Sequence, residues 1–315
     1  MKLKNCQHIV LMIAMLLAVF PGSAPAEGMK GAYLYNLSDF NGVIPYNWVS
    51  ICTDEKKGET YVADPSERLV RVFNDRGMEV YSFGDDGSFD NISAVAVTED
   101  DELFVLSRIN TSYSIIHCNF RGEPVGKMVL KGVPPEFFKD FVPDSIVYHG
   151  GRLYLGNRGT MKVVVVDKDG VFKDGYDLAA LMGLDEKKRH DADIVGFNVD
   201  HEGNILFTIP VFFSAYVVSP DHKVRSFGVR GSSPGKFNIV GGIASDKAGN
   251  IYVTDILRCV VMIFDKDFNF KTEFGYRGLD PGNLIAPMDI AVNNEMLYVT
   301  QSRARGVSVF RISAD

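Results

Sequence analysis

The sequence predicts an all-β fold, a six-bladed β-propeller that is closed by an N-terminal strand in the last blade. The first observation is a phrase that recurs six times: an apolar strand, a polar turn, and a second strand with an aromatic or aliphatic pair. Equivalent positions are 43, 50, 52, 46 and 46 residues apart, which matches the length of one four-stranded propeller blade. These positions are Tyr61, Phe104, Tyr154, Leu206, Tyr252 and Tyr298.

The second observation concerns the third strand of each unit. Nine residues after the end of each second strand, the chain carries an apolar residue inside a stretch rich in β-branched side chains. Because hydrophobic residues make up 46% of the chain, six matches in six units are not expected by chance. These third-strand positions are Phe73, Ile116, Val166, Val218, Phe264 and Phe310.

The third observation concerns closure of the ring. The last unit has three strands before the chain reaches Asp315, and residues 30–36 form a strand-like segment ahead of the first complete unit. Pairing this segment with the last unit removes two exposed sheet edges. We therefore expect residues 27–315 to form a single propeller domain.

Two longer connections interrupt the regular spacing, at residues 133–143 and 177–190. In the second of them, Leu178, Leu181 and Met182 recur at helical spacing. This pattern predicts a short helix whose apolar side packs on the propeller.

The first 26 residues have the pattern of a signal peptide. Lys2 and Lys4 precede an apolar run over residues 9–20, and Ala24 and Ala26 have the spacing of a cleavage site after Ala26. The run is shorter than the roughly 20 residues that span a bilayer. We therefore expect a periplasmic or secreted protein with no membrane span after signal removal.

The charge and the cysteine content exclude some classes of function. The net charge is −7, and it becomes −9 without residues 1–26, which contain two lysines and no acids. Nucleic-acid binding normally requires a basic face, so we expect no nucleic-acid partner. The remaining Cys52, Cys118 and Cys259 match no zinc or haem spacing. They predict buried thiols in strands, with one disulfide and one leftover thiol as the alternative.

Two kinds of motif resemble the NHL-repeat family. The phrase Asp-Lys-Ala-Gly-Asn-Ile-Tyr-Val-Thr-Asp at residues 246–255 is similar to the core phrase of that family, as are residues 60–64. The linkers at residues 227–237 and 274–284, which both begin Phe-Gly-X-Arg-Gly, are similar to its inter-blade connection. Family members usually carry an Arg five residues after the core Asp, and this chain has other residues there. The resemblance therefore implies a divergent, exported, bacterial-type member with a six-bladed propeller.

Strand direction places the loops after the second strands at one mouth of the central channel. Five of the six units carry an Arg in this loop, and a guanidinium can bind a carboxylate or a phosphate through two hydrogen bonds. We therefore predict a ligand-binding mouth formed by Arg68, Arg108, Arg158, Arg258, Arg303 and Arg305. The alternative is that these arginines pair within the chain with Asp64, Asp144, Asp193, Asp255 and Asp289.

The loop of the fourth unit, residues 210–216, carries no charge and contains three aromatic residues. Phe212 and Phe213 are candidates for a hydrophobic lip that contacts a ligand or a protein partner, whereas Tyr216 also fits a buried strand position. Trp48 precedes the first inner strand and either joins this mouth or plugs the closure.

An enzyme is the alternative to a binding protein. Asp144, Asp193 and Asp289, with Asn157, offer oxygen ligands for a calcium site in the channel, and a zinc site is the other metal option. The histidines are not expected to converge, because His149, His201 and His222 fall in turns on the opposite face, and no serine or cysteine nucleophile motif is present.

The residues therefore favour a non-catalytic binding scaffold without a cofactor. Its partner is expected to be an unidentified protein, an anionic ligand or a glycan. The alternative is a metal-dependent hydrolase or lyase with calcium or zinc in the channel.

Overall fold

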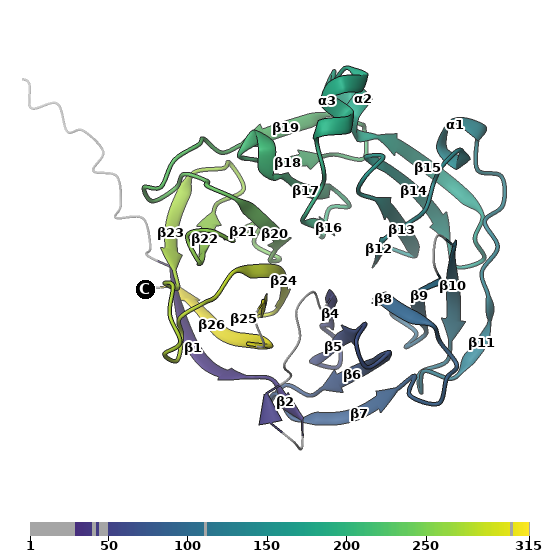
Figure 1. Cartoon of the computed structure of the whole chain (residues 1–315), viewed down its shortest axis with the longest axis horizontal. Helices are drawn as coiled ribbons and strands as arrows, with labels where there is room; N and C mark the ends of the chain where they lie inside the picture. Colours follow the sequence, from purple (N-terminus) through teal and green to yellow (C-terminus); the bar gives the residue numbers. More distant parts are fainter. Residues whose placement is uncertain (1–28, 40–41, 44–49, 110–111, 303–304, 315) are drawn as a thin grey trace, which may run out of the picture.

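The protein is a ring of six four-stranded antiparallel sheets (Figure 1). The inner strands of the ring line a central channel. The computed structural model describes residues 29–39, 42–43, 50–109, 112–302 and 305–314. The inner strands contact one another in ring order and return to the first blade. The predicted six-bladed propeller is confirmed.

Each blade contains four strands, counted from the channel outward. The inner strands are β4 (Ser50–Asp54), β8 (Asn91–Val97), β12 (Ser145–His149), β16 (Phe197–Val199), β20 (Val240–Ser245) and β24 (Pro287–Asn293). The second strands are β5 (Glu59–Asp64), β9 (Leu103–Ile109), β13 (Arg152–Asn157), β17 (Ile205–Ile209), β21 (Ile251–Asp255) and β25 (Met296–Gln301). The third strands are β6 (Leu69–Phe73), β10 (Ser112–Cys118), β14 (Lys162–Asp167), β18 (Ser214–Val218), β22 (Val260–Phe264) and β26 (Val307–Ala314). The outer strands are β7 (Glu79–Phe83), β11 (Pro124–Lys127), β15 (Phe172–Asp177), β19 (Val224–Phe227), β23 (Phe270–Phe274) and β1 (Met29–Asn36).

The core lies between the blades. The second and third strands are buried on both faces because each blade is covered by its two neighbours, and this explains their continuous apolar runs. All twelve positions that define the sequence repeat lie in these strands and are buried. The outer strands are partly exposed, like β7, or exposed at every residue, like β11. Their sequence signal is therefore weak.

The ring is closed by β1, which pairs with β26 in the last blade. The register runs from Met29 opposite Ala314 to Asn36 opposite Ser308. Leu37, which follows, is fully buried and donates its backbone N–H to the carbonyl of Val307 at 2.8 Å. The predicted closure by an N-terminal strand is confirmed. A small hairpin follows, formed by β2 (Ser38–Asp39) and β3 (Gly42–Val43).

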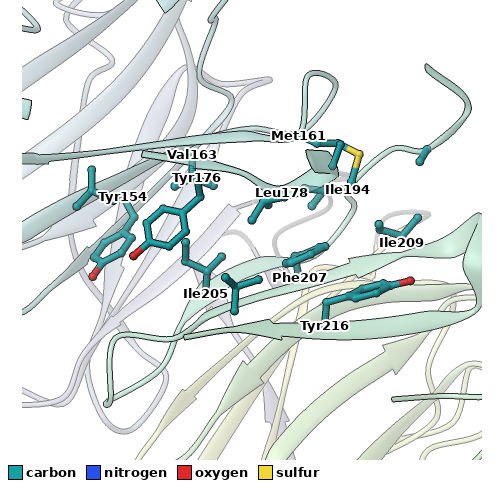
Figure 2. Packing of buried hydrophobic residues seen from close by; sticks show 14 residues of the cluster. Tyr154, Met161, Val163, Tyr176, Leu178, Ile194, Ile205, Phe207, Ile209 and Tyr216 are labelled. Atoms are coloured by element: carbon teal, nitrogen blue, oxygen red, sulfur yellow. The ribbon is translucent and has the colours of Figure 1, made fainter. Parts of the chain in front are cut away.

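The two long connections form short helices. The first contains α1 (Pro135–Phe138), and the second contains α2 (Leu178–Leu181) and α3 (Glu186–Asp191). Asp177 and Asp185 cap α2 and α3 through their carboxylates, as expected at helix N-termini. Leu178 is fully buried between the third and fourth blades, where it packs in a cluster with Ile194 (Figure 2). The predicted helix that packs on the propeller is confirmed, as two short helices instead of one.

The three cysteines in the described part of the chain are free thiols. Cys118 and Cys259 are buried, as predicted, whereas Cys52 is half-buried in the wall of the channel. Within the same residues, no helix is long and apolar enough to cross a membrane.

Candidate functional site

The inner strands enclose the central channel, a cavity with a volume of about 610 Å³. Its wall combines small polar residues, such as Ser50, Ser93 and Ser145, with aliphatic residues of all six inner strands. A cavity of this size is in the range of sites for small-molecule ligands. Charged groups gather at its two ends.

At the mouth formed by the ends of the second strands, Arg158 is held against Asp144. The Arg158 Nε donates to Asp144 Oδ1 at 2.9 Å, and the Arg158 backbone N–H donates to Asp144 Oδ2 at 3.2 Å. The Nη1 donates across to the carbonyl of Val195 in the fourth blade at 3.4 Å. The guanidinium lines the channel with its side chain 43% exposed, so part of its hydrogen-bonding capacity faces the cavity.

Asp289 lies at the start of β24 in the sixth blade, across the ring from the third blade that carries Arg158. Its Oδ1 accepts the backbone N–H of Ile290 at 2.9 Å. Burial raises the pKa of Asp289 to about 6, although Arg158 and backbone donors oppose this shift. Burial, together with the carboxylates of Asp54 and Asp289, also raises the pKa of the Cys52 thiol. The channel wall therefore contains a carboxyl that titrates near neutral pH and a thiol that stays protonated.

The raised pKa of Asp289 predicts a pH-dependent stability. The folded protein keeps a proton on Asp289 up to about pH 6, whereas the unfolded chain releases it near pH 3.9, so the free energy of unfolding falls as the pH rises through this window. Asp289→Asn removes this penalty and keeps the Oδ1 acceptor. We expect it to raise the free energy of unfolding at pH 7 by about 1–2 kcal/mol, below the full linkage value because the Asp289 side chain is only partly buried.

Urea unfolding at pH 4.5 and pH 7.5 measures this effect. Asp193→Asn is the matched control: Asp193 is exposed and lies outside the channel wall, so this variant should keep the pH dependence of the unmodified protein. An equal pH dependence of the Asp289→Asn variant and the unmodified protein would contradict the assignment.

The opposite end of the channel is crossed by one ion pair and one histidine–carboxylate contact. Glu55 in the first blade pairs with Lys247 in the fifth blade at 2.6 Å and lies 3.6 Å from His201 Nε2 in the fourth blade. His149, in the third blade, has a lowered pKa because of burial and because of the nearby His201. His149 and His201 both line the channel, on the face that the sequence predicted for them.

The other predicted arginines occupy different environments. Arg258 forms a two-pronged ion pair with Glu273 of β23, with 2.9 Å between Nη1 and Oε2, so it is fixed on the outer part of the fifth blade. Arg305 donates to the carbonyl of Leu279 at 3.1 Å. Arg68 and Arg108 are exposed, and Arg303 and Trp48 lie outside the described residues. The described arginines therefore do not form one ring around the mouth, and Arg158 is the arginine among them that lines the channel.

Three of the five aspartates that the alternative names as internal partners fall into two groups. Asp144 pairs with Arg158, as the alternative predicted. Asp64 and Asp255 instead accept backbone N–H groups in the turns that follow their strands, for example Asp255 Oδ1 from Arg258 N at 2.9 Å. These two carboxylates stabilise the loops at the mouth and are buried.

The predicted calcium ligands are only partly brought together. Asp144 and Asp289 line the channel, whereas Asp193 is exposed and lies outside the cavity wall. Asn157 accepts the backbone N–H of Thr160 through its side chain, at 3.0 Å. Among the residues that the structure describes, no group of three or more histidine, cysteine, aspartate or glutamate side chains has a geometry that could hold a metal ion.

The predicted hydrophobic lip packs largely on the protein itself. Pro210–Phe212 form a 3-10 turn, and Phe213 adopts a left-handed backbone conformation with φ of 53°. Phe212 packs against the core between the third and fourth blades and Phe213 against the core between the fourth and fifth. Tyr216 is buried, as its strand position suggested.

Comparisons with known proteins show the fold. No protein-family model and no curated protein sequence matches the chain. A protein of unknown function from Bacteroides thetaiotaomicron superposes with a TM-score of 0.64 and 11% identity, over 90% of this chain and 76% of that one. Virginiamycin B lyase from Staphylococcus aureus superposes with a TM-score of 0.55 and 13% identity, over 91% of this chain and 88% of that one. Regucalcin, a calcium-binding protein from Agrobacterium tumefaciens, superposes with a TM-score of 0.57 and 14% identity, over 88% of this chain and 95% of that one.

Proposed function

We propose that the chain is an exported, non-catalytic binding protein of NHL-repeat type, which takes a hydroxyl-bearing ligand such as a glycan into the mouth of its channel. Export rests on the signal-like pattern of residues 1–26, and the NHL-type assignment rests on the core phrase and the two linkers. Those linkers adopt the same conformation, since each forms an equivalent parallel bridge, between Arg230 and Phe237 and between Arg277 and Leu284.

The observation that carries this proposal is the pairing of Arg158 with Asp144 at the mouth, with Asp289 on the wall across the channel. A guanidinium donates hydrogen bonds and a carboxylate accepts them. A hydroxyl group does both, so a polyol satisfies this mixed set of groups. A simple anion is less suited, because the two carboxylates offset the single positive charge.

The contacts at the opposite end of the channel favour entry of a ligand through the mouth. The contacts of Glu55 with Lys247 and His201 join the first blade to the fifth and fourth blades across that end of the channel. A ligand that entered there would have to break these contacts, whereas the mouth presents Arg158 directly.

A ligand screen with the mature protein, residues 27–315, tests the proposal. We expect the unfolding temperature to rise with a mono- or oligosaccharide and to change little with simple dicarboxylates. Arg158→Leu should weaken sugar binding by about tenfold to a hundredfold, because a hydrogen bond to a charged group contributes about 1.5–3 kcal/mol. Arg68→Leu, on the exposed end of another loop, is the matched control. Binding that Arg158→Leu leaves intact would refute the assignment of this site.

The second candidate is a metal-dependent hydrolase or lyase with calcium or zinc in the channel. The observation in its favour is that Asp144 and Asp289 both line the cavity wall. The pairing of Asp144 with Arg158 opposes it, because the guanidinium already lies against that carboxylate. Metal analysis of protein purified without chelator separates the two candidates, since one tightly held equivalent of calcium or zinc supports the enzyme.

A further inference from the structure

A second surface, on the mouth face of the fifth and sixth blades, exposes large apolar residues beside basic ones. It consists of the loop segments 228–239, 256–258 and 275–286, which we call the basic rim. Tyr276 and Leu279 are 73% and 71% exposed, and Val229 and Leu257 are also exposed. Exposed apolar side chains gathered on one surface of a soluble domain mark an interaction site.

The basic rim is one continuous surface. Ile256 donates its backbone N–H to the carbonyl of Ile239 at 2.8 Å, which joins the first segment to the second. Arg277 Nη2 donates to the carbonyl of Leu257 at 2.9 Å, which joins the second segment to the third. Arg305 Nη1 extends the surface through the carbonyl of Leu279.

The backbone beneath the rim is fixed by buried anchors. Phe237 and Leu284 lie near the ends of the two long loops and are fully buried. Their backbone N–H groups donate to the carbonyls of Val229 and Tyr276, at 2.9 and 2.8 Å. Each loop therefore buries the apolar residue that lies seven positions after its Arg and leaves the apolar residue ahead of the Arg in solvent. Core packing explains the anchors but not the exposed positions.

The charge of the rim opposes that of the rest of the molecule. Its three segments contain four basic residues and one acidic residue, Asp280, in a chain whose net charge is −7. Arg258 is neutralised by Glu273, but Arg230, Lys236 and Arg277 are exposed. The guanidinium of Arg230 lies over the Phe213 ring at 4.8 Å, and Arg277 is held by a carbonyl, so both are positioned on the surface before a partner arrives.

We propose that the basic rim is a docking surface for an acidic polypeptide segment that alternates carboxylates with large apolar side chains. Arginine with aromatic and aliphatic residues is the composition typical of protein interfaces. The arginines are held at fixed positions, which suits two-pronged recognition of carboxylates more than the diffuse charge of a lipid surface. This surface is separate from the channel and does not depend on the ligand proposed for it.

Fluorescence anisotropy with a synthetic probe tests the proposal. The probe is a peptide of about ten residues that alternates Glu with Leu or Phe. The reference peptide has Gln in place of each Glu. We expect the mature protein to bind the acidic probe at least about tenfold more tightly than the reference peptide. Equal binding of the two peptides, or none, overturns the proposal.

Variants locate the binding. Arg277→Glu should weaken binding of the acidic probe by about tenfold or more, and the double variant Tyr276→Ser with Leu279→Ser should do so without any change of charge. Arg76→Glu is the matched control, because Arg76 is an exposed arginine on the opposite face. Unchanged binding by the rim variants, or an equal loss with Arg76→Glu, overturns the assignment.

Two further measurements exclude other occupants. Binding to phosphatidylglycerol vesicles that the rim variants abolish, in the absence of peptide binding, would assign the rim to a membrane surface. A dimer of the unmodified protein that the rim variants dissociate would assign it to a second copy of the chain. Either result overturns the proposal, and neither bears on sugar binding at Arg158.

Discussion

A variant that lacks residues 29–36 should lose the cooperative unfolding of the intact ring. These residues form β1, the outer strand of the last blade, and their removal exposes the whole edge of β26. It also uncovers Phe310, which packs edge-on against Tyr33 at 5.8 Å between ring centroids. We expect the unfolding temperature to fall by about 10 °C or more, and aggregation to increase because a free sheet edge pairs with other chains.

Thermal unfolding followed by circular dichroism, with light scattering in parallel, measures both effects. A synthetic peptide of residues 29–36 should recover part of the lost stability when added in excess, whereas a scrambled peptide should not. A truncated protein that unfolds at the temperature of the intact chain would show that the ring does not depend on this strand.

The fold could be predicted from the sequence because its signal repeats. Burial between two neighbouring blades forces the same apolar pattern on the second and third strands of every blade, and six copies of it are hard to miss. The outer strands have one face in solvent, so a strand such as β11, exposed at every residue, leaves almost no pattern. Closure could be predicted because the last unit lacked a strand that residues 30–36 could supply.

The site was harder to predict, because the loop position of an arginine does not determine its partner. Arg158 and Arg258 occupy similar loop positions, yet one lines the channel and the other pairs with Glu273 on the outer strand. The difference depends on Glu273, which lies 15 residues away in sequence. From the sequence, Cys52 is predicted only as a buried thiol, although its place in an inner strand is a signal that it could line the channel.

The contacts across the far end of the channel could not be predicted from spacing within one blade. Glu55 and Lys247 are 192 positions apart, and they meet because the ring brings their turns to the same opening. A sequence repeat shows that these turns share a face, which was predicted correctly for His149 and His201. It does not show that side chains long enough to cross the opening will pair there.

The second large effect is expected at Gly242, where β20 lies close against β24 of the next blade. A Cβ atom at this position would lie 2.8 Å from both Asp289 Cα and the carbonyl oxygen of Met288, and 2.9 Å from Ile290 N. These are backbone atoms of the neighbouring blade, so they cannot move aside as a side-chain end would. Gly242→Val should therefore push β20 away from β24 and cost about 3 kcal/mol or more in the free energy of unfolding.

Gly126→Val is the matched control for this substitution. Gly126 also lies in a strand, β11, but a Cβ atom there would meet no other atom within 4 Å. Urea unfolding should therefore show a large loss for Gly242→Val and little change for Gly126→Val, and equal midpoints would contradict the packing argument. Because Gly242 lies against Asp289, the same variant should also disturb the channel wall and weaken sugar binding. A loss of stability without a loss of binding would place the ligand away from β24, on the Arg158 side of the mouth.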